Sequence, residues 1–173
     1  EAVSSLIVDN SGNLCLYGVT ASSNFPSLPQ SAYPNFNGGS SFGFYQNGIV
    51  LCGGSDIFIS KFDSSGNFVW VKRMGGTGSD YTYSIVTDTT QNIYISGVFA
   101  NTVDFDPGAG VFNLTSNGSN DVIVLKADGL GNLIWAKSFG GTGNDYGTSL
   151  VVNKFNNVFT CGSFNNTVDF DQN

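Results

Sequence analysis

The sequence predicts an all-β fold built from repeated antiparallel strands. Three features support this prediction: an internal repeat, hairpin turns that recur with it, and a composition rich in glycine and aromatic residues. Glycine supplies 23 of the 173 residues, aromatic residues make up 14%, and only 11% of the residues are charged. This composition is typical of β structure with many tight turns and argues against an unfolded chain.

The repeat spans most of the chain. The segment Asp56–Gly108 recurs as Asp121–Asn173 without a gap, which gives a period of 65 residues, and 24 of the 53 aligned positions are identical. Such a period indicates stacked or radially arranged copies of one supersecondary unit. In the first copy Asn13 matches Asn92 at an offset of 79 residues, so that copy carries 14 extra residues.

Five turns share one pattern, with Asp or Asn in the first position and, in four of them, Gly or Asn in the fourth. This pattern favours a type I turn whose fourth residue takes a positive φ. Gln91 holds the fourth position of one turn and departs from the pattern. The turns are DNSGN (9–13), DSSGN (63–67), DTTQN (88–92), DGLGN (128–132) and NKFNN (153–157).

Each turn is flanked by two segments with strand character. Several segments are apolar on both faces, which predicts a sheet covered on both sides. Four serially connected antiparallel strands per period describe a propeller blade. The expected hairpins are Ser4–Val8 with Leu14–Val19, Ile57–Phe62 with Phe68–Arg73, Ser84–Thr87 with Ile93–Phe99, Val122–Ala127 with Leu133–Phe139, and Ser149–Val152 with Val158–Phe164.

The predicted architecture is therefore an incomplete β-propeller of about 2.7 blades. Residues 1–79 form the first blade with a long inserted loop at about 20–55, residues 80–144 form the second, and residues 145–173 begin the third. The repeat stops partway at Asn173, so we expect a piece of a longer protein. Its exposed edges would be covered by the remaining blades or by neighbouring chains.

The motifs also resemble a known family. D-x-F-x-x-K-F-D-x-x-G-N-x-x-W-x-K from Asp56, then G-G-T-G-x-D-Y, I-V-x-D and N-I-Y-x-x-G, look like the SBBP repeat of bacterial seven-bladed β-propeller proteins. By analogy, IVTD at 85–88 would lie innermost, followed outward by 92–98, 121–128 and 132–139. The resemblance implies a secreted or cell-surface protein outside the bacterial outer membrane.

Alternate connections of an antiparallel meander lie at opposite ends. The five short turns must therefore share one rim, and the GGTGxDY links must share the other with the long loops. Variable loops on a rigid scaffold are common binding positions. The candidate ligand-binding residues on this rim are Phe25, Tyr33, Tyr45, Asp80, Tyr81, Asp145 and Tyr146. For the two aspartates, the competing interpretation is that they accept hydrogen bonds from loop amides.

The motif V-D-F-D offers a possible calcium site. Asp104 and Asp106, with their copies Asp169 and Asp171, place two carboxylates two residues apart, and Ca²⁺ prefers such oxygen ligands. The EF-hand pattern is not matched, because a third acidic residue and the Glu are missing. The alternative is a solvated turn that caps amides. The sequence indicates no other cofactor.

Other repeated residues are expected to be structural. Trp70 and Trp135 occupy equivalent positions and should pack between blades. Lys61 and Lys126 lie in apolar strands and should extend along the sheet to solvent or pair with a carboxylate, for example Asp63 or Asp128. Free, buried thiols are favoured over a disulfide for the three cysteines, Cys15, Cys52 and Cys161.

Composition excludes several functions. The net charge is −7 with six scattered basic residues, so nucleic-acid binding is not expected. No apolar run reaches the roughly 18 residues of a membrane span, so membrane insertion is not expected either. Histidine is absent and the only Glu is Glu1, which leaves few groups for acid–base catalysis.

We therefore predict a non-enzymatic extracellular module of a large bacterial adhesin or scaffold, which binds a glycan or a protein through its long-loop face. One alternative is a structural spacer or secreted cargo segment without a ligand. A second is a propeller lyase or hydrolase whose active site lies outside these residues. Residues repeated in every blade are poor catalytic candidates, because active sites break symmetry.

Overall fold

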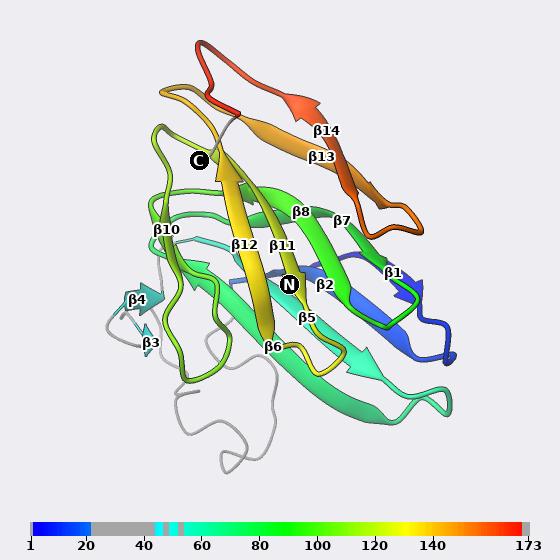
Figure 1. The fold of residues 1–173 in the computed structure, drawn as a ribbon. Helices are drawn as coiled ribbons and strands as arrows, with labels where there is room; N and C mark the ends of the chain where they lie inside the picture. Colours follow the sequence, from blue (N-terminus) through cyan, green and yellow to red (C-terminus); the bar gives the residue numbers. More distant parts are fainter. Residues whose placement is uncertain (1, 22–43, 47–48, 52–53, 171–173) are drawn as a thin grey trace.

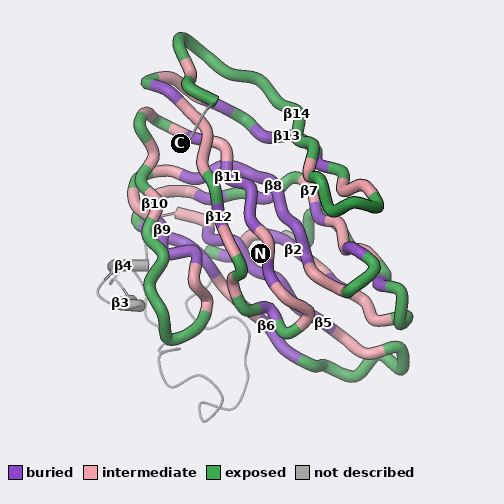
Figure 2. Tube along the Cα trace, viewed as in Figure 1, coloured by how far each residue is buried: buried purple, intermediate pink, exposed green. Residues whose placement is uncertain are grey.

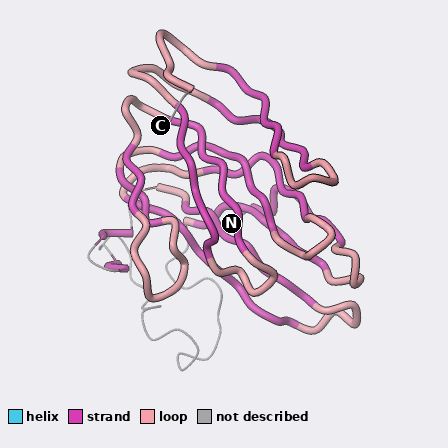
Figure 3. Tube along the Cα trace, in the orientation of Figure 1, coloured by secondary structure: helices cyan, strands magenta, loops and turns pink. Residues whose placement is uncertain are grey.

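The computed structural model describes residues 2–21, 44–46, 49–51 and 54–170. Every regular element in these ranges is a β-strand (Figures 1 and 3). The strands form four-stranded antiparallel meanders, each connected in series and each lying beside the next. The prediction of an all-β protein made of propeller blades is therefore confirmed.

The first meander has the order β1-β2-β5-β6 and the second the order β7-β8-β11-β12, with β13 and β14 forming a further hairpin. The innermost strand β7 packs beside both β1 and β13. The bounds are β1 (Ala2–Val8), β2 (Leu14–Thr20), β5 (Asp56–Phe62), β6 (Phe68–Gly76), β7 (Tyr81–Thr87), β8 (Ile93–Phe99), β11 (Asp121–Ala127), β12 (Leu133–Phe139), β13 (Tyr146–Val152) and β14 (Val158–Ser163).

Two small hairpins lie in the long connections. β3 (Phe44–Gln46) and β4 (Ile49–Leu51) form one between β2 and β5. β9 (Thr102–Asp104) and β10 (Asn113–Thr115) form the other, between β8 and β11. β9 also pairs with the end of β6, where Val103 lies opposite Gly76. The second meander thus reaches back to the outer strand of the first.

The five short turns gather at one rim of the molecule, away from the long connections, as the antiparallel topology requires (Figure 1). In each turn the first residue donates its amide to the carbonyl of the fifth. The fourth residue takes a positive φ in all five, including Gln91 at 67°. The turn geometry therefore prevails over the side chain at this position. The fourth residues are Gly12, Gly66, Gln91, Gly131 and Asn156.

A glycine in each second strand allows a bulge in the innermost hairpin. The pairing of β7 with β8 shifts between Thr82 and Ser84, and Gly97 faces Thr82. A Cβ atom on Gly97 would lie 2.1 Å from the carbonyl oxygen of Tyr81. The repeat places glycine again at Gly162, whose Cβ would meet the carbonyl oxygen of Tyr146. The bulge explains why the second strands carry this residue.

The core lies between the first two blades (Figure 2). Side chains from β2, β5 and β6 meet side chains from β8 and β11 in one cluster that includes Cys15, Ile59, Met74, Ile95 and Leu125. Trp70 belongs to this cluster, and its indole N–H donates to the carbonyl of Gly129 at 3.4 Å. The expected inter-blade packing of Trp70 is therefore confirmed.

Two expectations about side chains were wrong in part. Lys61 pairs with Asp9 at 3.1 Å and Lys126 with Asp88 at 3.7 Å, whereas Asp63 and Asp128 had been the suggested partners. In each blade the second strand pairs with the first strand on one side and the third strand on the other. The lysine of the third strand therefore lies close to the turn that joins the first two strands. Both described cysteines are free, but only Cys15 is buried; Cys161 is exposed on β14, and Cys52 lies outside the described residues.

Candidate functional site

The candidate site is the rim formed by the glycine links and the long connections, which we call the link rim. One link runs from Gly75 to Asp80 between β6 and β7, and the other from Gly140 to Asp145 between β12 and β13. The link rim lies opposite the five short turns (Figure 1). Its framework is set by the aspartate that ends each link.

Both link aspartates are buried and bound to backbone amides. Asp80 accepts hydrogen bonds from the amides of Gly76 and Ala100, each at 3.1 Å. Asp145 accepts equivalent bonds from Gly141 at 2.9 Å and Asn165 at 2.8 Å. Each carboxylate thus ties its link to the chain that follows the second strand. The interpretation of these aspartates as acceptors for loop amides is confirmed.

Burial affects the acidity of this framework. Desolvation raises the pKa of Asp80 to about 7, and the nearby charge of Asp56 raises it further, while the two amide hydrogen bonds oppose the rise. Burial also raises the pKa of Asp56, against the effect of the adjacent Arg73 guanidinium. A fully buried carboxyl that is held by two amides stabilises the rim, but it has no exposed surface with which to touch a ligand.

Three partly exposed tyrosines on β7 and β13 lie at or near the ends of the links. Tyr81 and Tyr146 directly follow the link aspartates, and they are 37% and 36% exposed. Tyr83 is 43% exposed. Burial raises the pKa of the Tyr83 hydroxyl, and the nearby hydroxyls of Tyr146 and Tyr81 raise it further. Tyr83 therefore lies near both Tyr81 and Tyr146, and we call these three residues of β7 and β13 the tyrosine cluster.

Sequence reasoning identified two members of this cluster and missed Tyr83. Tyr83 escaped because the next copy has Thr148 at this position, so the repeat does not mark it. The signal that could have found it is the pattern Tyr-Thr-Tyr. Both tyrosines are exposed, whereas Thr82 between them is buried.

The candidate residues of the long insertion do not add to the described geometry. Phe25 and Tyr33 lie outside the described residues. Tyr45 lies in β3 opposite Val50 of β4, and the structure describes the backbone there but not the side chain.

A scan against protein families identifies the repeat. Residues 69–98 match the family described as SBBP, a β-propeller repeat. This chain carries an SBBP β-propeller repeat. The matched residues run from β6 through the first link to β8, so the SBBP unit crosses from the outer strand of one blade to the inner hairpin of the next. It includes Asp80 and its partner Gly76, whereas Ala100 and Ser55, which also bond to Asp80, lie outside the matched residues.

Two curated relatives are similar to part of this chain. It is 28% identical over 120 residues to the uncharacterized WD repeat-containing protein L264 of Acanthamoeba polyphaga mimivirus, a match that covers 68% of this chain. It is 24% identical over 105 residues to the regulatory protein FlaEY of Caulobacter vibrioides, which covers 61%. The matches span 9% and 11% of those proteins, about a tenth of their length.

Two of the four V-D-F-D aspartates, Asp104 and Asp106, accept hydrogen bonds from backbone amides. Asp104 is buried and accepts hydrogen bonds from the amides of Asp106 at 3.0 Å and Phe112 at 2.8 Å. Asp106 accepts one from Gly108 at 2.8 Å. Asp169 is exposed and Asp171 lies outside the described residues. These contacts agree with amide capping, and no group of three or more potential metal ligands occurs among the described residues.

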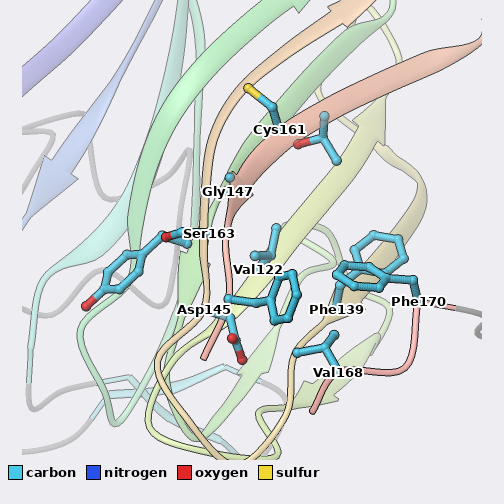
Figure 4. Close-up of a pocket in the computed structure, with 12 residues that line it drawn as sticks. Val122, Phe139, Asp145, Gly147, Cys161, Ser163, Val168 and Phe170 are labelled. Atoms are coloured by element: carbon cyan, nitrogen blue, oxygen red, sulfur yellow. The ribbon is translucent and has the colours of Figure 1, made fainter. Parts of the chain in front are cut away.

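An apolar pocket of about 390 Å³ opens between the second blade and the β13–β14 hairpin. Val122 and Phe139 come from the second blade, while Val168 and Phe170 follow β14, and all four gather around the pocket (Figure 4). The pocket is distinct from the tyrosine cluster, although Tyr146 contributes to its lining. Across the described part of the chain, no helix has the length and apolarity to cross a membrane.

Proposed function

We propose that this chain is a non-enzymatic β-propeller module that binds a glycan or a surface protein through its link rim. The observation that supports the proposal is that Tyr81, Tyr83 and Tyr146 are partly exposed, with Tyr83 near the other two, on strands whose links are fixed by buried carboxylates. Exposed aromatic rings with a polar hydroxyl offer both a flat apolar surface and a hydrogen-bonding group.

The long connection at the link rim also favours ligand binding there. The long connection of the first blade leaves at the same rim and is 14 residues longer than its counterpart, as the offsets of 79 and 65 residues require. Rigid scaffolds commonly place variable loops of this kind around a binding surface. The copies share the link aspartates and differ in the length of the long connection, and such a combination allows one fold to bind different ligands.

The chemistry of the rim supports a module without catalysis. The sequence has no histidine, and its only Glu is Glu1. Asp80, whose pKa of about 7 would suit a general base, is fully buried and held by two backbone amides. A general base must lie within hydrogen-bonding reach of the proton that it removes, which this burial prevents.

The proposed location is outside the bacterial cell, secreted or on the outer-membrane exterior, as part of a large adhesin or scaffold. The acidic composition, with six basic residues in 173, is compatible with that location. The partners are then a surface glycan or protein at the link rim, and further blades or neighbouring chains along the open strand edges.

The test is binding of the chain to glycan and surface-protein arrays, comparing two variants. One combines Tyr81→Ala, Tyr83→Ala and Tyr146→Ala. The matched control is Phe155→Ala, an aromatic that is 72% exposed on the opposite rim. We expect the triple variant to lose at least tenfold in affinity and the control to bind like the parent. Absence of binding by the parent would favour the spacer, and equal loss in both variants would remove the link rim from the proposal.

A further inference from the structure

The outer edge of the β13–β14 hairpin is an open strand edge with apolar side chains on it. Within the described residues β14 pairs with β13 alone. Phe159, Phe164 and Phe170, on and after β14, are 56%, 57% and 59% exposed. Large apolar side chains gathered beside an unpaired strand edge are typical of a surface that another strand covers.

The preceding copy of the repeat shows the same positions when covered. Sixty-five residues earlier stand Tyr94, Phe99 and Phe105, and none of them is more than 1% exposed. Their aromatic contacts are repeated, since Phe99 packs edge-on against Phe105 as Phe164 does against Phe170. The ring packing of Phe164 and Phe170 is therefore the same as that of the buried pair, and the two copies differ in whether a further strand covers the rings.

In that preceding copy the cover is β11. Gly97 of β8 lies opposite Ile123 of β11. Ile123 is fully buried in one cluster with Phe99 and Phe105 from its own blade and with side chains of β5 and β6. The β11 side chain thus fills the space between two adjacent blades.

The apolar pocket is the same space in the next copy. Its walls include Val122, Phe139, Gly162, Phe164 and Phe170. In the preceding copy the corresponding positions surround Ile123, and four of them belong to its buried cluster: Ile57, Met74, Phe99 and Phe105. A pocket of about 390 Å³ is large enough for more than one side chain of a strand.

The register of the covering strand occurs twice in the structure. Asp56 of β5 lies opposite Thr20 of β2, and Asp121 of β11 lies opposite Phe99 of β8. Thr20 and Phe99 both correspond to Phe164. An incoming strand of this type would therefore place its aspartate opposite Phe164, and its third residue opposite Gly162 would point into the pocket.

The sixth residue of the strand is where the third copy differs. In the first two copies this residue is a lysine that pairs with the first aspartate of the inner turn, Lys61 with Asp9 and Lys126 with Asp88. In the third copy the turn begins with Asn153, which accepts the amides of Phe155 and Asn157 as the aspartates do in their turns. An ammonium buried here would have no carboxylate from that turn, and burying an unpaired charge is costly.

We propose that the free edge of β14 and the apolar pocket form an acceptor site for the third strand of a further copy of this repeat, and that Asn153 selects a strand whose sixth residue is uncharged. The strand runs antiparallel to β14 and begins with aspartate, followed by alternating aliphatic residues. This inference does not depend on ligand binding at the link rim, and its test involves neither glycan nor surface protein.

The experiment uses the 173-residue chain and fluorescent peptides of Ser119–Asp128, whose first strand residue is Asp121. One peptide keeps Lys126 and the other carries Lys126→Thr. Fluorescence anisotropy should show the threonine peptide binding at least tenfold tighter. The variant Asn153→Asp restores the turn carboxylate and should reduce or reverse this preference. A third peptide with Ile123→Asp, which places a charge in the pocket, should not bind.

Three results would overturn the proposal. They are no binding of either peptide, equal binding of the Ile123→Asp peptide, and relative affinities for the threonine and lysine peptides that Asn153→Asp leaves unchanged. Sedimentation of the chain alone identifies the competing occupant. A dimer that forms through this face and is not dissociated by the threonine peptide would assign the face to a second copy of the chain instead.

Discussion

The ammonium of Lys61 lies 3.1 Å from Oδ2 of Asp9, and each side chain is more than nine-tenths buried. Lys61 belongs to the third strand of its blade and Asp9 to the turn between the first and second strands. The same ammonium lies 3.5 Å from the carbonyl oxygen of Gly129 in the next blade. One side chain therefore joins three parts of the fold that are distant in sequence.

Replacing Lys61 with methionine should lower the stability of the chain by about 2–4 kcal/mol, because the carboxylate of Asp9 would stay buried without its counter-charge. Methionine retains most of the apolar length of the lysine side chain, so packing changes little. Urea unfolding followed by circular dichroism measures the effect. The matched control is Lys137→Met, at an exposed position, which should change stability by less than about 0.5 kcal/mol. Equal effects of both substitutions would show that the ion pair contributes nothing.

A second prediction concerns the left-handed position of the turns. Gln91 has φ 67°, a conformation that costs a residue with a Cβ atom about 1 kcal/mol or more. Gln91→Gly should therefore raise stability by about 0.5–1 kcal/mol, since the turn keeps its backbone bonds. Gly66 has φ 82°, and an added Cβ would have no atom within 4 Å. Gly66→Ala therefore adds the same backbone strain without a steric clash and should lower stability. Changes of the same sign in the urea midpoints of the two variants would contradict this explanation.

The repeat accounts for how much of the fold the sequence could predict. Hairpin turns and strand pairing depend on short-range patterns, and the 65-residue period repeats those patterns, so the blade could be derived without coordinates. The partner of Lys61 could not be derived in this way. Asp63 is its near neighbour in sequence, but Asp9 lies beside it only because β1 and β5 flank the same strand.

The candidate site shows the same limit. Asp80 and Tyr81 were found because the next copy repeats them as Asp145 and Tyr146. Tyr83 is not repeated, and its proximity to Tyr146 depends on β7 packing beside β13, which no pattern within a single strand reveals. Repetition identifies the framework of the site, whereas residues that differ between copies determine its chemistry.

A third prediction tests the bulge in the inner hairpin. Gly97→Ala would place a Cβ atom 2.1 Å from the carbonyl oxygen of Tyr81, far inside contact distance. The two strands must separate, so we expect a loss of about 3 kcal/mol or more. Thermal unfolding measures it. Gly108→Ala, where the nearest atom would lie at 3.0 Å on the side chain of Asp106, should be tolerated far better. Similar melting temperatures for the two variants would contradict the bulge geometry.

The last prediction concerns pH. Because burial raises the pKa of Asp80 from 3.8 to about 7, the folded chain binds a proton more tightly than the unfolded chain. The stabilisation by this group is therefore fully present below pH 3.8 and is lost as the pH rises through 7. Between pH 5 and 8 the chain should lose about 2–3 kcal/mol of stability from this group, using about 1.4 kcal/mol per unit of pKa.

Asp80→Asn removes the titrating carboxyl and should flatten the fall in urea midpoint between pH 5 and 8, whatever its effect on absolute stability. Asp63→Asn is the matched control, because hydrogen bonds from Asn67 lower the pKa of Asp63 below 3.8 and it does not titrate in this range. Its pH profile should follow that of the parent. An unchanged slope in Asp80→Asn would mean that the link carboxylate is ionised throughout, and the buried amides of Gly76 and Ala100 would then be sufficient to hold its charge.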